Sequence, residues 1–181
     1  MNARRTSART ATFAAGLAAA FCLLMPSAIA DSQPPAGSHV PATVAAENGT
    51  LECDSIPPDR DPEIARIVYD VGVERGADDR VLLSAMEAGW VESHMNNLDC
   101  GDADSLGVFQ QRPSQGWGTP EQIMDPVYAS NKYYDQAIPN AANNPSWTAG
   151  QVAQSVQRSA YPERYDQAEP KAREMIAEIT G

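Results

Sequence analysis

Three times in this chain, an Asp or Thr, both of which cap helices, is followed at once by proline. The pairs are Asp61-Pro62, Thr119-Pro120 and Asp125-Pro126. Asp and Thr side chains accept hydrogen bonds from the free N–H groups of a first helical turn. Proline suits the first helical position because it needs no partner for a backbone N–H there. Each pair therefore predicts a helix start, and the fold class is predicted to be mainly α.

Apolar residues at helical spacing support these starts and predict further helices. Two helices are expected over about 62–76 and, after a cap at Asp78, over 79–93. Further helices are expected to begin at Thr119-Pro120, at Asp125-Pro126, at Thr148 and at about Pro170. Residues 106–111 differ, because their apolar and polar side chains partly alternate. That pattern is typical of extended backbone, so a small β-hairpin is expected beside the end of the second helix.

The N-terminal residues 1–30 have the pattern of a secretory signal peptide. Three arginines come first, an apolar stretch over 13–25 follows, and Ala28-Ile29-Ala30 fits a small-x-small cleavage site. A membrane anchor is the alternative, but the stretch is short and Pro26 follows it. Residues 31–50 are rich in Pro, Ala, Ser and Gly and are predicted to be a disordered linker. One domain is expected over 51–181, as a secreted monomer that has no membrane contact after cleavage.

The charge of the chain limits its partners. The formal net charge is −11, and loss of residues 1–30, with three arginines and no acid, leaves −14. Such a surface argues against nucleic acid and anionic lipid as partners. It is also unfavourable for binding an anionic cell wall.

Cys53 and Cys100 form an even pair once Cys22 leaves with the signal peptide. In an oxidising compartment this pair predicts a disulfide that closes a loop of 47 residues. The chain-entropy model gives such a loop roughly 4 kcal/mol of stabilisation. A catalytic or metal-binding thiol is the less favoured alternative, since no Cys-x-x-Cys pair exists and the chain has two histidines.

Two motifs point to chemistry. Glu92-Ser93 stands at the predicted end of the second helix, and Gly107-Val108-Phe109-Gln110 follows a polar loop. In their order and spacing these motifs resemble the lysozyme-like superfamily, most closely the branch of goose-type lysozymes and soluble lytic transglycosylases. The segment from Asp104 through Trp117 to Pro126 is further similar to secreted actinobacterial and phage-associated members.

The resemblance implies that Glu92 is the catalytic acid and base, and that Ser93 steadies its carboxyl or the helix end. Gln110 and the backbone around Gly107 are then expected to contact a sugar. The family carries a later tyrosine whose hydroxyl reaches the catalytic Glu, and Tyr161 is the residue placed there by this resemblance. The Asn and Gly that follow that tyrosine in the family are absent here.

Other acids offer alternatives. Glu87 lies five positions before Glu92, about 140° around the helix, so both are not expected at one cleft, and Glu87 is expected to be buried or in an interhelical salt bridge. Asp102 or Asp104 is a possible second carboxylate, which an inverting hydrolase needs to activate water. Aspartates that satisfy turns are the simpler interpretation. Leu106 interrupts an EF-hand pattern, so no metal site is predicted.

Aromatic side chains are candidates for stacking on sugar rings, although core packing explains most of them. Trp117, between two glycines, is the best candidate, and Phe109 is another. The expected function is cleavage of the β-1,4 glycan strand of peptidoglycan, without a cofactor. A non-catalytic wall-binding module and a chitin-type hydrolase are the alternatives. A carboxyl that donates a proton near neutral pH needs a raised pKa, which partial burial provides.

Overall fold

The computed structural model describes residues 52–181. The predicted signal peptide over 1–30, with Cys22, and the predicted linker over 31–50 lie outside the described residues. Within 52–181, no helix is both long enough and apolar enough to cross a bilayer.

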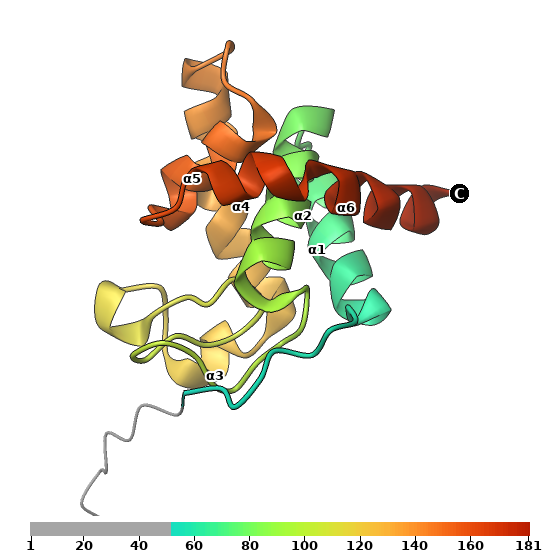
Figure 1. Cartoon of the computed structure of the whole chain (residues 1–181). Helices are drawn as coiled ribbons and strands as arrows, with labels where there is room; N and C mark the ends of the chain where they lie inside the picture. The colour runs from blue at the N-terminus through green and yellow to red at the C-terminus, as the bar shows by residue number, and fades with distance from the viewer. Residues whose placement is uncertain (1–51) are drawn as a thin grey trace, which may run out of the picture. The chain divides into compact units, whose positions relative to one another are not determined.

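The described part of the chain is mainly helical, as predicted (Figure 1). Its helices are α1 (Pro62–Glu74), α2 (Asp79–Ser93), α3 (Pro120–Ile123), α4 (Pro126–Asn143), α5 (Ala149–Gln157) and α6 (Glu163–Thr180), with a 3-10 turn, η1 (Pro113–Gln115). The predicted caps are confirmed by hydrogen bonds from first-turn N–H groups to the side chains of Asp61, Asp78, Thr119, Asp125 and Thr148. Local capping chemistry therefore sets five of the helix starts.

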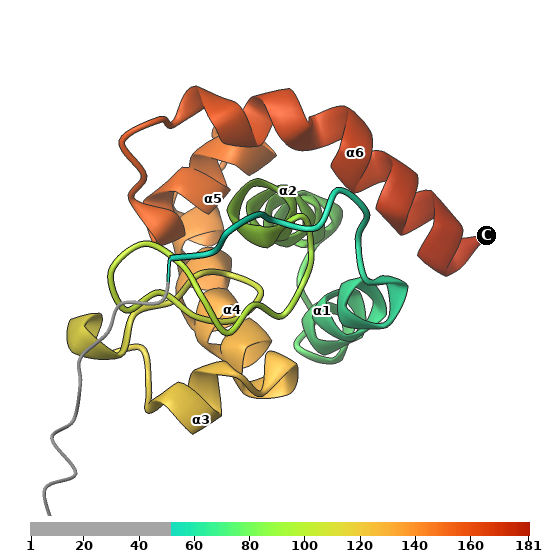
Figure 2. The ribbon, with the colours of Figure 1, turned by 60° about the horizontal axis from the view of Figure 1, so that its bottom comes forward.

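The predicted start of the last helix is wrong. α6 begins at Glu163, seven residues before Pro170, and Pro170 lies inside it. A proline in a helix leaves the carbonyl four residues earlier without its N–H partner. Here both Asp166 and Pro170 are exposed, so water can satisfy that carbonyl. Figure 2 shows α6 curving around the outside of α2.

The predicted β-hairpin is not formed, and the described residues contain no strand. Leu106 and Gln111 make a single antiparallel bridge, with both N–H to O=C distances at 2.9 Å. Between them, Gly107 has a φ of 75° and Gln110 a φ of 47°. Positive φ values interrupt extended backbone, so residues 106–111 form a tight loop instead of paired strands.

Helix α2 is the centre of the domain. In Figure 2 it is seen nearly end-on, with α1, α4, α5 and α6 around it. Every residue from Val81 to Gly89 is buried, so this helix is covered on all sides rather than along one face. Gly89 lets the loop after α2 fold back onto the helix, since a Cβ on Gly89 would lie 2.7 Å from the Met95 side chain. Burial of α2 fixes the position of its C-terminal end, where Glu92 lies.

The predicted disulfide between Cys53 and Cys100 is present, with a Cα–Cα distance of 5.0 Å. It joins the segment before α1 to the loop after α2. Two hydrogen bonds reinforce this connection: His94 Nδ1 lies 2.9 Å from the carbonyl oxygen of Pro57, and Asn96 Nδ2 donates to that of Asp59 at 3.0 Å. One disulfide and two hydrogen bonds thus hold the loop after α2.

Candidate active site

Glu92 is the next-to-last residue of α2 and is partly buried. Burial raises the pKa of its carboxyl, while the hydroxyl of Tyr165, the amide of Gln157 and the charge of Arg164 act in the opposite direction. The negative end of the α2 dipole also disfavours an ionised carboxyl at this position. Glu92 therefore has the environment that a proton donor needs near neutral pH.

The tyrosine that reaches Glu92 is Tyr165, and the prediction of Tyr161 is wrong in this respect. Tyr165 is fully buried on α6, and its hydroxyl donates to Glu92 Oε1 at 2.6 Å. Tyr161 is 54% exposed, and the Arg164 guanidinium lies 4.3 Å from its ring centroid. Tyr165 could have been found from helical spacing, because it shares a buried stripe with Ala168 and Ala172.

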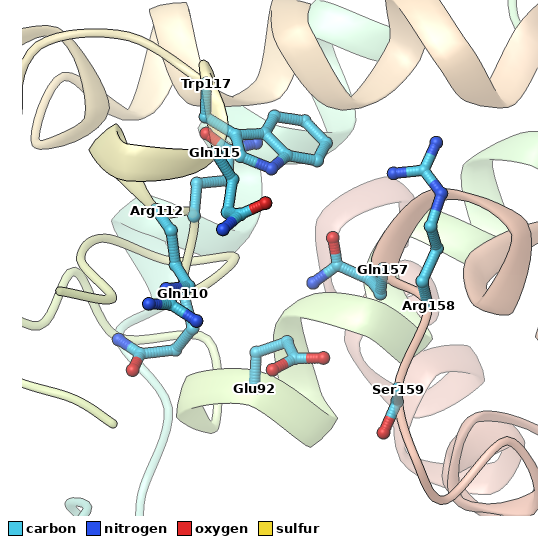
Figure 3. Close-up of a pocket in the computed structure, with 9 residues that line it drawn as sticks. Glu92, Gln110, Arg112, Gln115, Trp117, Gln157, Arg158 and Ser159 are labelled. Carbon is cyan, nitrogen blue, oxygen red and sulfur yellow. The ribbon is translucent and has the colours of Figure 1, made fainter. Parts of the chain in front are cut away.

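A cavity of about 320 Å³ opens over the Glu92 carboxyl (Figure 3). Glu92 lies at its floor. One wall carries the side chains of Arg112, Gln115 and Trp117, and the opposite wall those of Gln157, Arg158 and Ser159. The lining is rich in amide and guanidinium groups with one large aromatic ring, so it offers hydrogen bonds and a stacking surface to a polar ligand.

Three of the residues named as site candidates, Ser93, Phe109 and Gly107, have structural roles outside the cavity lining. Ser93 is buried, and its hydroxyl donates to the Val108 carbonyl at 2.7 Å, so it ties the end of α2 to the loop over 106–111. Phe109 is 1% exposed and stacks on Tyr133 at 4.7 Å. Gly107 is needed for its positive φ and for close approach, because a Cβ there would lie 2.6 Å from the Ile123 carbonyl oxygen.

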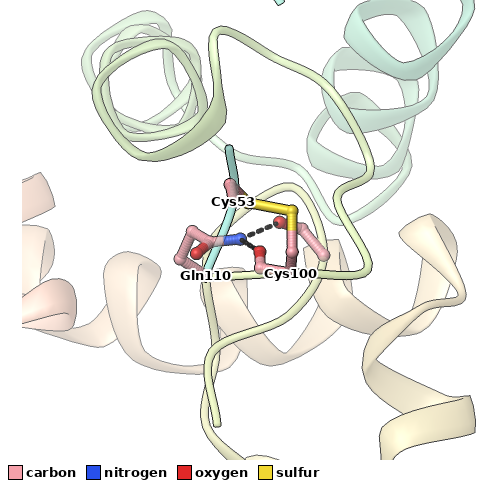
Figure 4. Close-up of a disulfide and its surroundings, with 4 residues drawn as sticks. Cys53, Cys100 and Gln110 are labelled. Atoms are coloured by element: carbon pink, nitrogen blue, oxygen red, sulfur yellow. Dashed lines mark hydrogen bonds between the residues drawn. A yellow bond between two sulfur atoms is a disulfide. The ribbon is translucent and has the colours of Figure 1, made fainter. Parts of the chain in front are cut away.

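Gln110 borders the cavity, but its amide is turned toward the disulfide (Figure 4). Gln110 Nε2 donates to the carbonyl oxygens of Cys100 at 3.1 Å and Gly107 at 3.2 Å. The residue predicted to contact a sugar through its amide therefore uses that amide to hold the loop. Trp117 does line the cavity, in the position predicted for a wall residue.

Neither of the aspartates proposed as a second carboxylate lines the cavity. Asp104 accepts from Arg112 Nε at 2.6 Å and from the Ser114 N–H at 2.8 Å, and these bonds hold the pKa of Asp104 far below its usual range. Asp102 is exposed. Both sit in the turn over 102–105, which agrees with the simpler interpretation of turn-forming aspartates. Glu92 is thus the one carboxylate among the cavity-lining residues of the described chain.

Gln157 and Arg158 are functional candidates that the sequence did not reveal. Gln157 ends α5, and its amide donates to the Phe109 carbonyl at 2.9 Å, which links α5 to the loop over 106–111. Arg158 follows with a φ of 55°. Both reach the cavity because α5 packs against α2, a contact between segments about 65 residues apart that no local motif reports.

Glu87 is a second acid with an unusual environment. It is completely buried, and within the described residues neither carboxyl oxygen has a hydrogen-bond partner. Burial, with the charges of Asp166 and Glu169 on α6, raises the pKa of Glu87 to about 8. The expected burial is confirmed, whereas the alternative of an interhelical salt bridge is wrong. Glu87 does not line the cavity over Glu92.

Glu87 is expected to make the protein less stable as pH rises. The unfolded state releases this proton near pH 4.5 and the folded state near pH 8, so the folded state binds more protons between these values and the free energy of unfolding falls. At pH 7 the free energy of unfolding is about 3 kcal/mol lower than it is below pH 4.5, because of this one group. Glu87→Gln removes the titration and should raise the free energy of unfolding at pH 7 by about that amount, with no gain below pH 4.5. Urea titrations at several pH values measure it.

The matched control for this prediction is Glu74→Gln, which removes an exposed carboxylate from the end of α1. It should leave the slope of stability against pH unchanged. A Glu87→Gln protein whose stability falls with pH as steeply as that of the wild type would show that another group causes the fall.

The described residues contain no group of three or more His, Cys, Asp or Glu side chains that could hold a metal ion. The candidate site therefore consists of the shielded Glu92 carboxyl, the Tyr165 hydroxyl that donates a hydrogen bond to it, and the polar cavity over Glu92. No protein-family model and no curated protein matches the chain.

Proposed function

We propose that this protein is a secreted glycosidase that cleaves the β-1,4 glycan strand of peptidoglycan. The observation that carries the proposal is the Glu92 carboxyl, shielded at the floor of the cavity and bonded to the Tyr165 hydroxyl. The resemblance of Glu92-Ser93 and Gly107-Val108-Phe109-Gln110 to lysozyme-like enzymes supports the same chemistry. The disulfide agrees with an oxidising compartment outside the cell.

In this proposal Glu92 first donates its proton to the glycosidic oxygen between two sugars. The sugar that loses its leaving group becomes oxocarbenium-like, and the Glu92 carboxylate is left beside it. Tyr165 then stabilises that carboxylate by donating its O–H. In the second half, Glu92 takes a proton from the nucleophile and returns to its starting state.

The nucleophile in this proposal is a hydroxyl of the cleaved sugar itself. An inverting hydrolase needs a second carboxylate to activate water, and Asp102 and Asp104 lie outside the cavity lining. Intramolecular attack needs no such group, because the hydroxyl is held next to the reacting carbon. The product is then an anhydro-sugar, which is lighter than the hydrolysis product by one water.

Product analysis tests this function. Purified wild-type protein is incubated with peptidoglycan sacculi and, in parallel, with chitin oligomers, and soluble products are identified by mass spectrometry. Anhydro-sugar ends from sacculi are the expected result. Ordinary reducing ends would show that the reaction is hydrolysis and not intramolecular attack. Cleavage of chitin alone would show that the substrate is a chitin-type polymer. No product, with the protein sedimenting with the sacculi, would instead identify a wall-binding module.

Tyr165→Phe is expected to lower the maximal rate on the order of tenfold, because one hydrogen bond to the Glu92 carboxylate is lost. Since that bond lowers the pKa of Glu92, its loss should move the alkaline limb of the pH–rate profile to higher pH. Tyr161→Phe is the matched control, since the exposed Tyr161 makes no bond to Glu92 in the described structure. An alkaline limb that moves to lower pH in Tyr165→Phe would contradict this role.

A further inference from the structure

The cavity has a charge opposite to that of the chain. The net charge of the chain is −11, yet two arginines, Arg112 and Arg158, line the cavity with Glu92 as its one carboxylate. When Glu92 holds its proton, the lining carries two positive charges and no negative one. Positive groups inside a negative surface favour a ligand with a negative charge at a defined place.

The two arginines differ in how far their charge is neutralised. Arg112 donates from Nε to Asp104 at 2.6 Å, so a carboxylate of the protein already pairs with it. Arg158 donates to neutral oxygens: Gln136 Oε1 at 3.0 Å and the Val156 carbonyl at 3.4 Å. A guanidinium has five N–H donors, so these contacts leave donors for a ligand. Among residues 52–181, Arg158 makes no ion pair with a carboxylate.

The backbone at Arg158 gives a second, independent observation. This residue follows α5 in the left-handed conformation, with φ 55° and ψ 40°. Glycine is the residue that takes this position after a helix at least cost. An arginine here accepts backbone strain and places its side chain on the wall beside Gln157, opposite Trp117 (Figure 3).

We propose that Arg158 is a specificity-determining residue that binds a carboxylate of the substrate next to the bond that is cleaved. The inference rests on the proposed function and narrows it to glycan chains that carry acid groups, in preference to neutral chains. The planar guanidinium can hold a carboxylate with two parallel hydrogen bonds. In peptidoglycan that carboxylate belongs either to the lactyl ether of the sugar, when the peptide is absent, or to the attached peptide.

The test compares three substrates of similar length: chitin oligomers, glycan chains stripped of peptide by an amidase, and chains that keep their peptides. For wild type, Arg158→Gln and Arg158→Lys, kcat and KM are measured on each. Arg158→Gln is expected to lower kcat/KM about tenfold, mainly through KM, on the acidic chain that carries the bound carboxylate, and to affect the residual cleavage of chitin oligomers much less. Arg158→Lys should recover part of the loss, because it keeps the charge without the planar fork.

The two acidic substrates locate the carboxylate. A loss on stripped chains alone assigns it to the lactyl group, and a loss on peptide-bearing chains alone assigns it to the peptide. Arg66→Gln is the matched control, since Arg66 is exposed on α1, does not line the cavity and carries the same charge. It should behave as wild type. An equal loss on acidic and neutral chains, or no loss in Arg158→Gln, would overturn the proposal.

Failure of the proposed function gives a different result. If wild type cleaves none of the three substrates, the glycosidase proposal fails, and sedimentation with the same chains then tests Arg158 as a binding residue. Binding to acidic chains that weakens about tenfold in Arg158→Gln, and not in Arg66→Gln, would support the carboxylate contact without catalysis. Equal binding by all three proteins would refute it.

Discussion

Glu92→Gln is expected to lower the rate of glycan cleavage by about 10²–10⁴-fold, the usual contribution of general acid–base catalysis. The glutamine amide has nearly the shape of the carboxyl, but it cannot donate a proton to the glycosidic oxygen or take one back. KM should change little, since the cavity walls remain intact. The rate of release of soluble fragments from sacculi measures the effect.

The same variant should not be less stable than the wild type. Burial raises the pKa of Glu92, which means that its ionised form is disfavoured in the folded protein, and glutamine removes that ionisation. Glu163→Gln, at the exposed start of α6, is the matched control and should keep full activity. If Glu92→Gln retained more than a tenth of the wild-type rate, Glu92 would not be the proton donor.

Loss of the disulfide is expected to have the largest effect on stability. The double variant Cys53→Ser, Cys100→Ser should lower the free energy of unfolding by roughly 4 kcal/mol, because the unfolded chain regains the entropy of an open loop of 47 residues. Denaturant titrations of the double variant and of the oxidised wild type give the difference directly. The m-value for unfolding should also be smaller for the wild type than for the variant. The closed loop keeps the unfolded wild-type chain more compact, so that less surface is exposed on unfolding.

Reduction of the wild type provides the control for this experiment. Dithiothreitol should bring the wild type to the stability of the double variant and leave the double variant unchanged. A difference below 1 kcal/mol would mean that polar contacts, such as that between Asn96 and the Asp59 carbonyl, hold the loop without the covalent bond. Activity should fall as well, because the Cys100 carbonyl positions Gln110 at the edge of the cavity.

Helix starts with a side-chain cap were predictable from the sequence, and the start of α6 was not. Asp61, Asp78 and Asp125 act within three residues of their own position, so their pattern can be read locally. α6 starts after Pro162 without any side-chain cap, and Pro170 gave a misleading start signal. Tertiary packing of the stripe that contains Tyr165 and Met175 determines this helix.

The predicted β-hairpin over 106–111 is wrong for a different reason. Its alternation of side chains is that of a strand, but Gly107 and Gln110 take positive φ values. Gly107 permits such a value, whereas nothing in the sequence marks Gln110 for it. Its amide bonds to the carbonyl oxygens of Cys100 and Gly107 hold it there, and these depend on the folded loop.

For the candidate site, the sequence singled out Glu92 and Trp117, which the structure brings to one cavity, but it did not find the residues of α5 and α6 around them. The motif around Glu92 is contiguous, whereas Tyr165 lies 73 residues away and Arg158 follows the end of another helix. These residues meet Glu92 because α5 and α6 pack on α2. Conversely, Phe109 is part of the motif Gly107-Val108-Phe109-Gln110 and yet belongs to the core.

The position of Tyr165 on α6 has a consequence for a newly made chain. Ribosomes produce α6 after every segment that lines the cavity, so the Tyr165 hydroxyl reaches Glu92 only when α6 docks on α2. Until then the carboxyl is less shielded, and an unshielded glutamate is ionised at neutral pH. Under the proposed function, the shielding that keeps a proton on Glu92 is therefore complete only once α6 has docked on α2.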